Sequence, residues 1–540
     1  MKLENFSLLY PDGQTIKRHL AGMDIPDLDM YTLQELGMLE VFDPKNAPLA
    51  DFFTTNPAVI TYRNQTFTDM LSNPVLAETL QKLVPVLQDI GELRRLTVED
   101  GDDSSAYLSA MTEIELYITC VDILHEGMAA VKDNLRGTAF KRLCDCVLEL
   151  AESDYYKELN EKLSDLTKRV REIRSVTVGV NLDAQLRPVQ AGVLSVNAKP
   201  FKSGETLDKI LRLNFKEDEY TCIAKLVPFG KKQTENQKTA LSLAFNSAIN
   251  EVYRSSLRSW KKIVEVYVLE NTDFLLGLMP EIEFMVKGTE LQRRLLAKGC
   301  PLCLPTLCPA EARVFRATGL YNPAVALKLP EGEDIVPNDI AFDTSDDNAM
   351  IYVLTGPNRG GKSVITCAVG LCQAMLQLGM YLPAASCEIS PADGIYTHFP
   401  TGADDTIDKG RLGEECARLG EIFDAVTPQS LVLMDESLSS TGSFEASYIA
   451  AEILAGLAHV GCRCLFSTHL HELAAELDRI NADSATSGGT KIDTLVAGIE
   501  SEGRRSFIIT RAKPDGKSYA RDIATRYGLT YNEIMKKIKR

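Results

Sequence analysis

The chain has 540 residues, more than one hydrophobic core supports, so roughly two to four domains are expected. Apolar residues make up 45% and charged residues 25%, which excludes a disordered or fibrous protein. The net charge of −17 excludes a surface that attracts nucleic acid everywhere, so any such partner needs a local basic patch.

The sequence gives no sign of a membrane or secreted protein. No apolar run approaches the ~18 residues of a membrane span, and Met1–Asn5 does not begin a secretory signal. The 13 cysteines are scattered and odd in number, as expected for reduced thiols. We therefore predict a cytoplasmic protein without a membrane partner.

The first part of the chain divides into an N-terminal segment and a helical region. Residues 1–70 carry short apolar runs that indicate no function. In the segment from about 73 to 174, apolar residues recur at helical spacing, and further helices are expected near 104–132 and 137–173. The recurring residues are Leu76, Leu80, Leu83, Val86 and Leu87. Such apolar stripes are typical of ordinary core packing.

The period changes near Ser175, where a small β element is expected. Val176–Asn181 and Ala191–Asn197 are predicted strands on either side of a turn at Arg187-Pro188. A second helical stretch follows over about 234–271. Two long helical segments around a β element indicate a lever with a tip, within a region of residues 71–310.

The lever region has its own charge. Residues 157–262 hold 20 Lys and Arg against 12 Asp and Glu, a balance of +8. The clusters lie at 168–174, 231–232 and 254–262. Such residues neutralise the phosphates of nucleic acid, which makes DNA a candidate partner of 157–262. A solvated helical face has the same composition, and composition does not separate the two.

A short cysteine cluster lies near the end of the helical region. Cys300 and Cys303 form a single CxxC, and Cys308 follows. A zinc site normally needs a second pair or nearby histidines, which are missing, so free or buried thiols in a loop are favoured over a metal.

From about residue 311 strands and helices alternate, as in a parallel sheet, and Ile351–Thr355 runs directly into a glycine-rich turn. The spacing of Gly356, Gly361, Lys362 and Ser363 fits a P-loop, in which glycines let backbone N–H groups surround phosphate oxygens. Lys362 is expected to reach the β- and γ-phosphates and Ser363 to hold Mg²⁺. A helix over about 364–379 directs its positive end at the same anion. The predicted nucleotide-binding residues are Gly356, Pro357, Asn358, Arg359, Gly360, Gly361, Lys362, Ser363 and Val364; the alternative is a chance glycine-rich turn.

A second glycine-containing segment, Asp408–Glu415, opens a helix that runs to about Val426. In ABC-type ATPases a signature loop at this place completes the neighbouring subunit's site in trans. Gly413 would then offer a backbone N–H to a γ-phosphate. The alternative is a plain helix cap.

Two further apolar strands end in polar residues. Leu431–Met434 leads into Asp435, a Walker-B ligand for Mg²⁺, and Glu436, a base that activates the attacking water. Two solvated acids after a buried strand are the alternative. His469 ends the other strand, where it is expected to contact the γ-phosphate or to have a structural role only.

These segments together resemble the MutS family of DNA mismatch-repair ATPases. The match covers Thr355–Ser363, Ser430–Glu436 and Thr468-His469 with Glu472-Leu473. Residues 335–339 resemble the family's segment before the P-loop, and residues 516–520 with the helices to Arg540 resemble its C-terminal dimerisation region. The resemblance is strong over about 310–540 and weaker over about 70–310. It implies a dimer with two composite ATP sites that closes around duplex DNA.

The sequence also departs from the family pattern. Gly410-Arg411 is followed by Leu412-Gly413 instead of the usual Ser-Thr pair, and Ser437–Ser440 replace Ile-Gly-Arg-Gly. About 70 residues precede the helical core, too few for the family's mismatch-reading domain, so a short form that lacks this domain is expected. Phe215-Lys-Glu217 matches the reader's Phe-x-Glu motif by letters but lies mid-chain.

The resulting prediction is a mixed fold. An α-helical core and lever region with a small β-containing clamp precedes an α/β P-loop ATPase domain of ABC type over 311–540. We predict a homodimeric, Mg²⁺-dependent ATPase that hydrolyses ATP and clamps duplex or branched DNA in mismatch repair or recombination. The alternative is a nucleotide-switched scaffold for a protein or ribonucleoprotein, with which the acidic net charge agrees.

Overall fold

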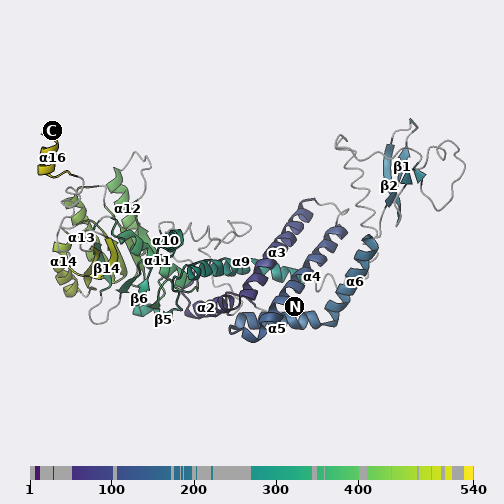
Figure 1. Cartoon of the computed structure of the whole chain (residues 1–540), viewed down its shortest axis with the longest axis horizontal. Coiled ribbons are helices and arrows are strands. Elements are labelled where there is room, and N and C mark those ends of the chain that lie inside the picture. The colour runs from purple at the N-terminus through teal and green to yellow at the C-terminus, as the bar shows by residue number, and fades with distance from the viewer. Residues whose placement is uncertain are drawn as a thin grey trace. The chain divides into compact units, whose positions relative to one another are not determined.

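The computed structural model describes part of the chain, in two compact units (Figure 1). The described residues are 6–11, 28, 52–100, 106–171, 175–182, 184–185, 188–197, 202–203, 221–222, 269–342, 349–357, 359–400, 410–438, 441–470, 473–487, 489–499, 505–513 and 528–538. Unit 1 comprises Met1–Leu3, Glu78–Asp133 and Lys141–Met279, and unit 2 comprises Glu4–Ala77, Asn134–Phe140 and Pro280–Arg540. The division into 1–70, 71–310 and 311–540 stays a prediction.

Long helices supply most of unit 1. They are the greater part of α3 (Pro74–Asp100), α4 (Ala106–Val131), most of α5 (Thr138–Glu152), α6 (Asp154–Arg171) and the start of α9 (Leu269–Ala297). Leu80, Leu83 and Leu87 of the predicted stripe are fully buried, which confirms core packing. Arg94 of α3 ion-pairs with Glu113 of α4 and Asp273 of α9, so one guanidinium joins three helices.

The helix predicted over 137–173 is two helices. Ser153 separates α5 from α6, and its Oγ accepts the N–H of Tyr156 at 3.2 Å, as an N-cap does. Its own N–H donates to the Leu150 carbonyl at 3.1 Å and thereby ends α5. The apolar spacing is the same on both sides, so the helical period alone did not reveal this break.

The predicted β element is present: β1 (Ser175–Leu182) pairs antiparallel with β2 (Pro188–Asn197). Two short strands follow, β3 (Lys202–Ser203) and β4 (Thr221–Cys222). Residues 234–268 of the predicted helix lie outside the described residues, and residues 269–271 begin α9. Phe215–Glu217 and the basic clusters at 231–232 and 254–262 also lie outside them. The side chains of 168–174 are not described either.

A six-stranded sheet forms the centre of unit 2, in the order β10-β11-β12-β8-β13-β14. Its strands are β8 (Ile351–Thr355), β10 (Ile395–His398), β11 (Leu431–Asp435), β12 (Arg463–Ser467), β13 (Ile492–Ile499) and β14 (Arg505–Arg511). The first five run parallel, and β14 pairs antiparallel with β13. The expected α/β architecture is therefore confirmed.

Helices cover both faces of this sheet. On one face α11 (Lys362–Gln377) packs so closely that a Cβ at Gly370 would lie 2.6 Å from Leu433 Cδ1. The other face, which presents Val353, Val432 and Phe466, shares a buried core with three helices. These are α12 (Gly410–Ala425), α13 (Ser443–Val460) and α14 (Leu473–Ser487).

Smaller elements complete unit 2. A second sheet has the order β5-β9-β6-β7. The remaining elements are α2 (Pro57–Ser72), η4 (Lys132–Asn134, of which only Asn134 belongs to unit 2), β5 (Thr306–Leu307), η6 (Ala310–Ala312), β6 (Phe315–Leu320), α10 (Pro323–Lys328), β7 (Asn338–Phe342), β9 (Ser386–Ile389) and α16 (Tyr531–Ile538). Among the described helices, none combines the length and apolarity that a membrane crossing requires.

Part of the N-terminal segment belongs to the core of unit 2. The fully buried Arg63 of α2 donates from Nε to the Leu9 carbonyl at 3.2 Å and also bonds the Phe52 carbonyl. Glu281 of α9 accepts the Leu8 N–H at 2.6 Å. The segment is thus attached by one buried and one half-buried charge, and breaking these contacts would be costly.

Candidate nucleotide-binding site

The turn after β8 needs glycine for geometric reasons. Gly356 has φ +138° and Gly361 has φ +91°, which side-chain-bearing residues rarely adopt. A Cβ at Gly356 would lie 2.8 Å from Ala497 Cβ, and one at Gly360 would lie 2.9 Å from the Pro357 carbonyl oxygen. The predicted glycines therefore form a cradle that added side chains would fill.

Lys362 is the first residue of α11, directly after this cradle, and only 4% of it is exposed. Its Nζ donates to the carbonyl oxygens of Gly356 and Pro357, each at 3.3 Å. Burial lowers the pKa of Lys362, and the nearby carboxylates of Glu436 and Asp435 oppose that shift. The ammonium is thus held over the turn, where an anionic ligand would compensate its burial.

The strand order brings the other predicted residues to the same edge. Asp435 at the end of β11 pairs with Ser467 of β12, which pairs with Leu354 of β8. Asp435 is 7% exposed, and its buried Oδ1 has no hydrogen-bond partner. Carboxylate oxygens are ligands that Mg²⁺ prefers, so an Asp435 oxygen without a partner fits a divalent cation.

Glu436 and His469 meet beside Lys362. The His469 Nε2 lies 2.9 Å from Glu436 Oε1 and 3.3 Å from Lys362 Nζ. A proton on Nε2 is best donated to the carboxylate, which leaves the lysine as a close neighbour. Three residues predicted from separate segments are thus brought together.

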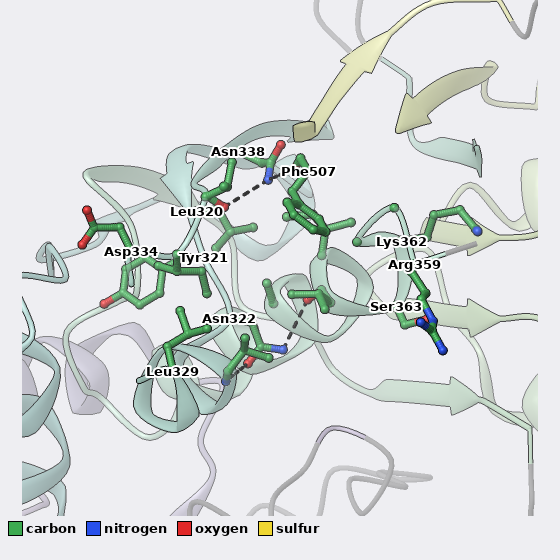
Figure 2. Close-up of a pocket in the computed structure, with 18 of the residues that line it drawn as sticks. Leu320, Tyr321, Asn322, Leu329, Asp334, Asn338, Arg359, Lys362, Ser363 and Phe507 are labelled. Atoms are coloured by element: carbon green, nitrogen blue, oxygen red, sulfur yellow. Dashed lines mark hydrogen bonds between the residues drawn. The ribbon is translucent and has the colours of Figure 1, made fainter. Parts of the chain in front are cut away.

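A cavity of about 550 Å³ continues from the P-loop. Lys362 and Ser363 line one end, and Leu320, Tyr321 and Leu329 are among the apolar residues along the rest (Figure 2). Glu436 and Phe507 also line the cavity. Its volume and apolar walls suit a small organic ligand such as a nucleoside.

Sequence reasoning missed the wall formed by Phe507. This residue of β14 has φ +58°, and its carbonyl accepts Asn338 Nδ2 at 3.1 Å. The Asn338 Oδ1 accepts the Ile509 N–H at 2.6 Å. One amide therefore holds β14 against β7. Residues 335–339 were noted only for their likeness to a family segment, and no local pattern pairs Asn338 with Phe507.

The remaining predicted residues have less specific positions. Arg359 has φ +60° within the P-loop, and the Val364 carbonyl accepts Asn322 Nδ2 at 3.3 Å. Asn358 lies outside the described residues. Gly413 is exposed in the first turns of α12 and is not among the residues that line the cavity.

The cysteine cluster gives no support to a metal site. Cys303 exchanges backbone hydrogen bonds with Leu382 at 3.0 and 2.8 Å, and burial raises the pKa of its thiol to about 12. Over the described stretches, no three His, Cys, Asp or Glu side chains are grouped as metal ligands. Cys300, Cys303 and Cys308 are free thiols.

Four features together define the class of P-loop domains: a buried parallel strand, a glycine-rich turn, a lysine that opens the next helix and a carboxylate at the end of a nearby strand. Comparisons with known families narrow this class. Residues 352–496 match the model of MutS domain V, and residues 55–298 match that of the MutS2 N-terminal domain. The chain belongs to the MutS family.

Individual relatives match between 29% and 38% of the chain. The DNA mismatch repair protein Msh6 of Gallus gallus is 36% identical over 186 residues, 33% of this chain and 14% of the relative. The DNA mismatch repair protein MutS of Salinibacter ruber is 37% identical over 164 residues, 29% of this chain and 18% of the relative. The MutS of Myxococcus xanthus is 31% identical over 213 residues, covering 38% and 22%. The match thus spans less than a quarter of each relative.

Proposed function

We propose that the protein is a Mg²⁺-dependent ATPase whose hydrolysis site lies at the carboxyl ends of β8, β11 and β12. The observation that carries the proposal is the convergence of Lys362, Glu436 and His469 beside the unpartnered Oδ1 of Asp435. Family membership supports it, because MutS domain V matches this part of the chain.

Each residue has a role that its environment supports. The P-loop N–H groups and the Lys362 ammonium bind the phosphates, and Ser363 with Asp435 would hold Mg²⁺, which neutralises phosphate charge when bound. Glu436 accepts the proton of the attacking water, and His469 orients Glu436 while contacting the terminal phosphate. The apolar cavity bounded by Phe507 takes the nucleoside.

The substitution Glu436→Gln tests the assignment of the base. Because the amide cannot accept the proton, we expect kcat for ATP to fall by ~10²–10⁴-fold while the Kd of Mg–ATP changes little. Single-turnover hydrolysis and equilibrium binding would be measured on the same preparation. Near-normal turnover by a folded Glu436→Gln protein would refute this role.

We further propose that two copies assemble with Gly413 of each facing the other's nucleotide. Exposed apolar side chains support such a contact: Phe444 and Tyr448 of α13 are 83% and 65% exposed, one helical turn apart. Phe444→Asp should lower the dimer fraction in light scattering with Mg–ATP and leave the monomer folded. Unchanged dimerisation would exclude this surface.

The proposed partner is duplex or branched DNA, in mismatch repair or recombination. The relatives are named DNA mismatch repair proteins, and the +8 balance of residues 157–262 supplies positive charge. DNA affinity should then fall steeply with salt, since phosphate contacts release counterions. A salt-insensitive complex would contradict contacts through this segment.

The second candidate is a nucleotide-switched scaffold for a protein or ribonucleoprotein in the cytoplasm. The net charge of −17 favours this candidate, since an acidic surface repels nucleic acid. Gel shifts across paired, mismatched, branched and single-stranded DNA, with and without Mg–ATP, separate the two. No nucleotide-dependent DNA binding at all would favour the scaffold.

A further inference from the structure

One residue of α12 contacts the loop that follows the Walker-B strand twice. The Glu415 side chain accepts the Leu438 N–H at Oε2, 2.5 Å away. The Glu415 backbone carbonyl lies 3.2 Å from Nε2 of His398, the last residue of β10. Glu415 therefore ties α12 both to this loop and to the strand beside β11.

The loop between these contacts has an unusual backbone. Glu436 has φ +46° and Leu438 has φ +65°, in the left-handed region that residues other than glycine rarely adopt. Such a turn persists only where its surroundings fix it. The Glu436 N–H donates to the Ser467 carbonyl at 2.9 Å, and Glu415 holds the Leu438 N–H. The direction of the Glu436 side chain depends on both anchors.

The His398 side chain also contacts this turn, at Ser437. It is 1% exposed, and its Nδ1 lies 2.7 Å from Ser437 Oγ. Burial and the Arg418 charge lower the pKa of His398, so the ring is neutral at pH 7. Nε2–H then donates to the Glu415 carbonyl, and the Ser437 hydroxyl lies between Nδ1 and the His398 carbonyl oxygen, which accepts it at 2.8 Å. The ring thus links α12 to the residue between Glu436 and Leu438.

We infer that Glu415 is a positioning residue for the water-activating base: its carboxylate fixes the turn that orients Glu436, so that α12 controls the rate of ATP hydrolysis. The inference rests on the proposed ATPase function. Glu415 itself does not line the nucleotide cavity. Its loss should therefore slow hydrolysis and leave nucleotide binding intact.

Three variants and one control test this role. In Glu415→Ala the Leu438 N–H has no acceptor, and we expect kcat to fall ~10- to 100-fold, as misoriented catalytic groups do. In Glu415→Gln the amide oxygen accepts the same N–H, and most of the rate should return. Glu415→Asp withdraws the carboxylate by one methylene while keeping its charge, and an intermediate rate is expected. The control Glu421→Ala removes an exposed carboxylate from the same helix and should leave kcat unchanged.

The measurements are steady-state ATP turnover, the Kd of Mg–ADP by calorimetry and thermal unfolding of each variant. The inference holds if kcat is lowest in Glu415→Ala, intermediate in Glu415→Asp and closest to wild type in Glu415→Gln. The KM for ATP and the Kd of Mg–ADP should stay constant across these variants. The inference is overturned by wild-type kcat in Glu415→Ala or, where that variant does not fold, in Glu415→Asp. Equal loss in Glu415→Ala and Glu415→Gln, or a parallel loss of Mg–ADP binding, also overturns it. Absent turnover in the wild-type protein would instead refute the proposed ATPase.

Discussion

The substitution Lys362→Met separates the contribution of this lysine to nucleotide binding from its contribution to folding. Methionine keeps the length and apolar stem but removes the ammonium. In the structure, Nζ makes two long hydrogen bonds of 3.3 Å to P-loop carbonyls, and burial lowers the pKa of Lys362. A buried charge held by long bonds adds little stability, so unfolding free energy should change by less than about 1 kcal/mol.

Nucleotide affinity should change much more. A hydrogen bond from an ammonium to a phosphate oxygen contributes about 1.5–3 kcal/mol, which corresponds to a roughly 10- to 150-fold weaker Kd in the variant. The stability that bound ligand adds depends on the same Kd. Mg–ATP at 100 times the wild-type Kd raises the unfolding free energy of the wild type by about 2.7 kcal/mol. At the same Mg–ATP concentration the variant should keep only about 0.3–1.4 kcal/mol of that gain.

The assay is urea unfolding with and without Mg–ATP, combined with calorimetric titration. Lys491→Met is a matched control, because Lys491 lies in the same unit with a side chain 55% exposed and only a 3.7 Å ion pair to Asp493. The control should bind as the wild type does. A folded Lys362→Met protein with wild-type affinity would refute the assignment of Lys362 to the phosphates.

Three other outcomes follow from single side chains. Asp69 is 1% exposed and accepts two backbone N–H groups of residues 136–137 at 2.8 Å each, so Asp69→Asn should cost about 1.5–3 kcal/mol in urea unfolding. A change under about 0.5 kcal/mol would contradict this anchoring. In Gly356→Ala the new Cβ would meet Ala497 at 2.8 Å with φ at +138°; both Mg–ATP binding and about 1–3 kcal/mol of stability should be lost, and intact binding would disprove the cradle. Since burial lowers the pKa of His398, the unfolded chain takes up this proton first; the stability from the neutral ring is complete above about pH 6.5 and is lost below it. His398→Gln should reduce the stability difference between pH 7.5 and 5.5, and an unchanged difference would mean that the ring is not held neutral.

The parts of the site that the sequence predicted are contiguous in the chain. The P-loop, Asp435 with Glu436, and His469 each follow an apolar strand, and parallel strands bring their carboxyl ends to one edge of a sheet. Local spacing therefore sufficed to predict that these residues belong to one site before the strand order was known, and their roles stay predictions.

The parts that the sequence could not predict are contacts between distant segments. The bond from Asn338 to Phe507 joins residues 169 positions apart, and Glu415 reaches Leu438 through a side chain on a helix that was considered only for Gly413. The break at Ser153 was missed for a different reason. A serine within a helical pattern is common, and only its bond to the Tyr156 N–H shows that it begins a new helix.

Helix α11 shows why such contacts matter for any nucleotide response. It has 16 residues, about 24 Å in length, with the P-loop at its first turn. Just beyond its last turn, the Gly379 carbonyl accepts Asn64 Nδ2 of α2 at 2.7 Å, and the Tyr381 N–H donates to Gln292 Oε1 of α9 at 3.1 Å. A helix packed on both sides moves as a rigid body, so a shift of the P-loop must either break these bonds or move α2 and α9 with it. Because all four groups that form these two bonds are inside unit 2, the first step of a conformational signal from the nucleotide is determined by this unit alone.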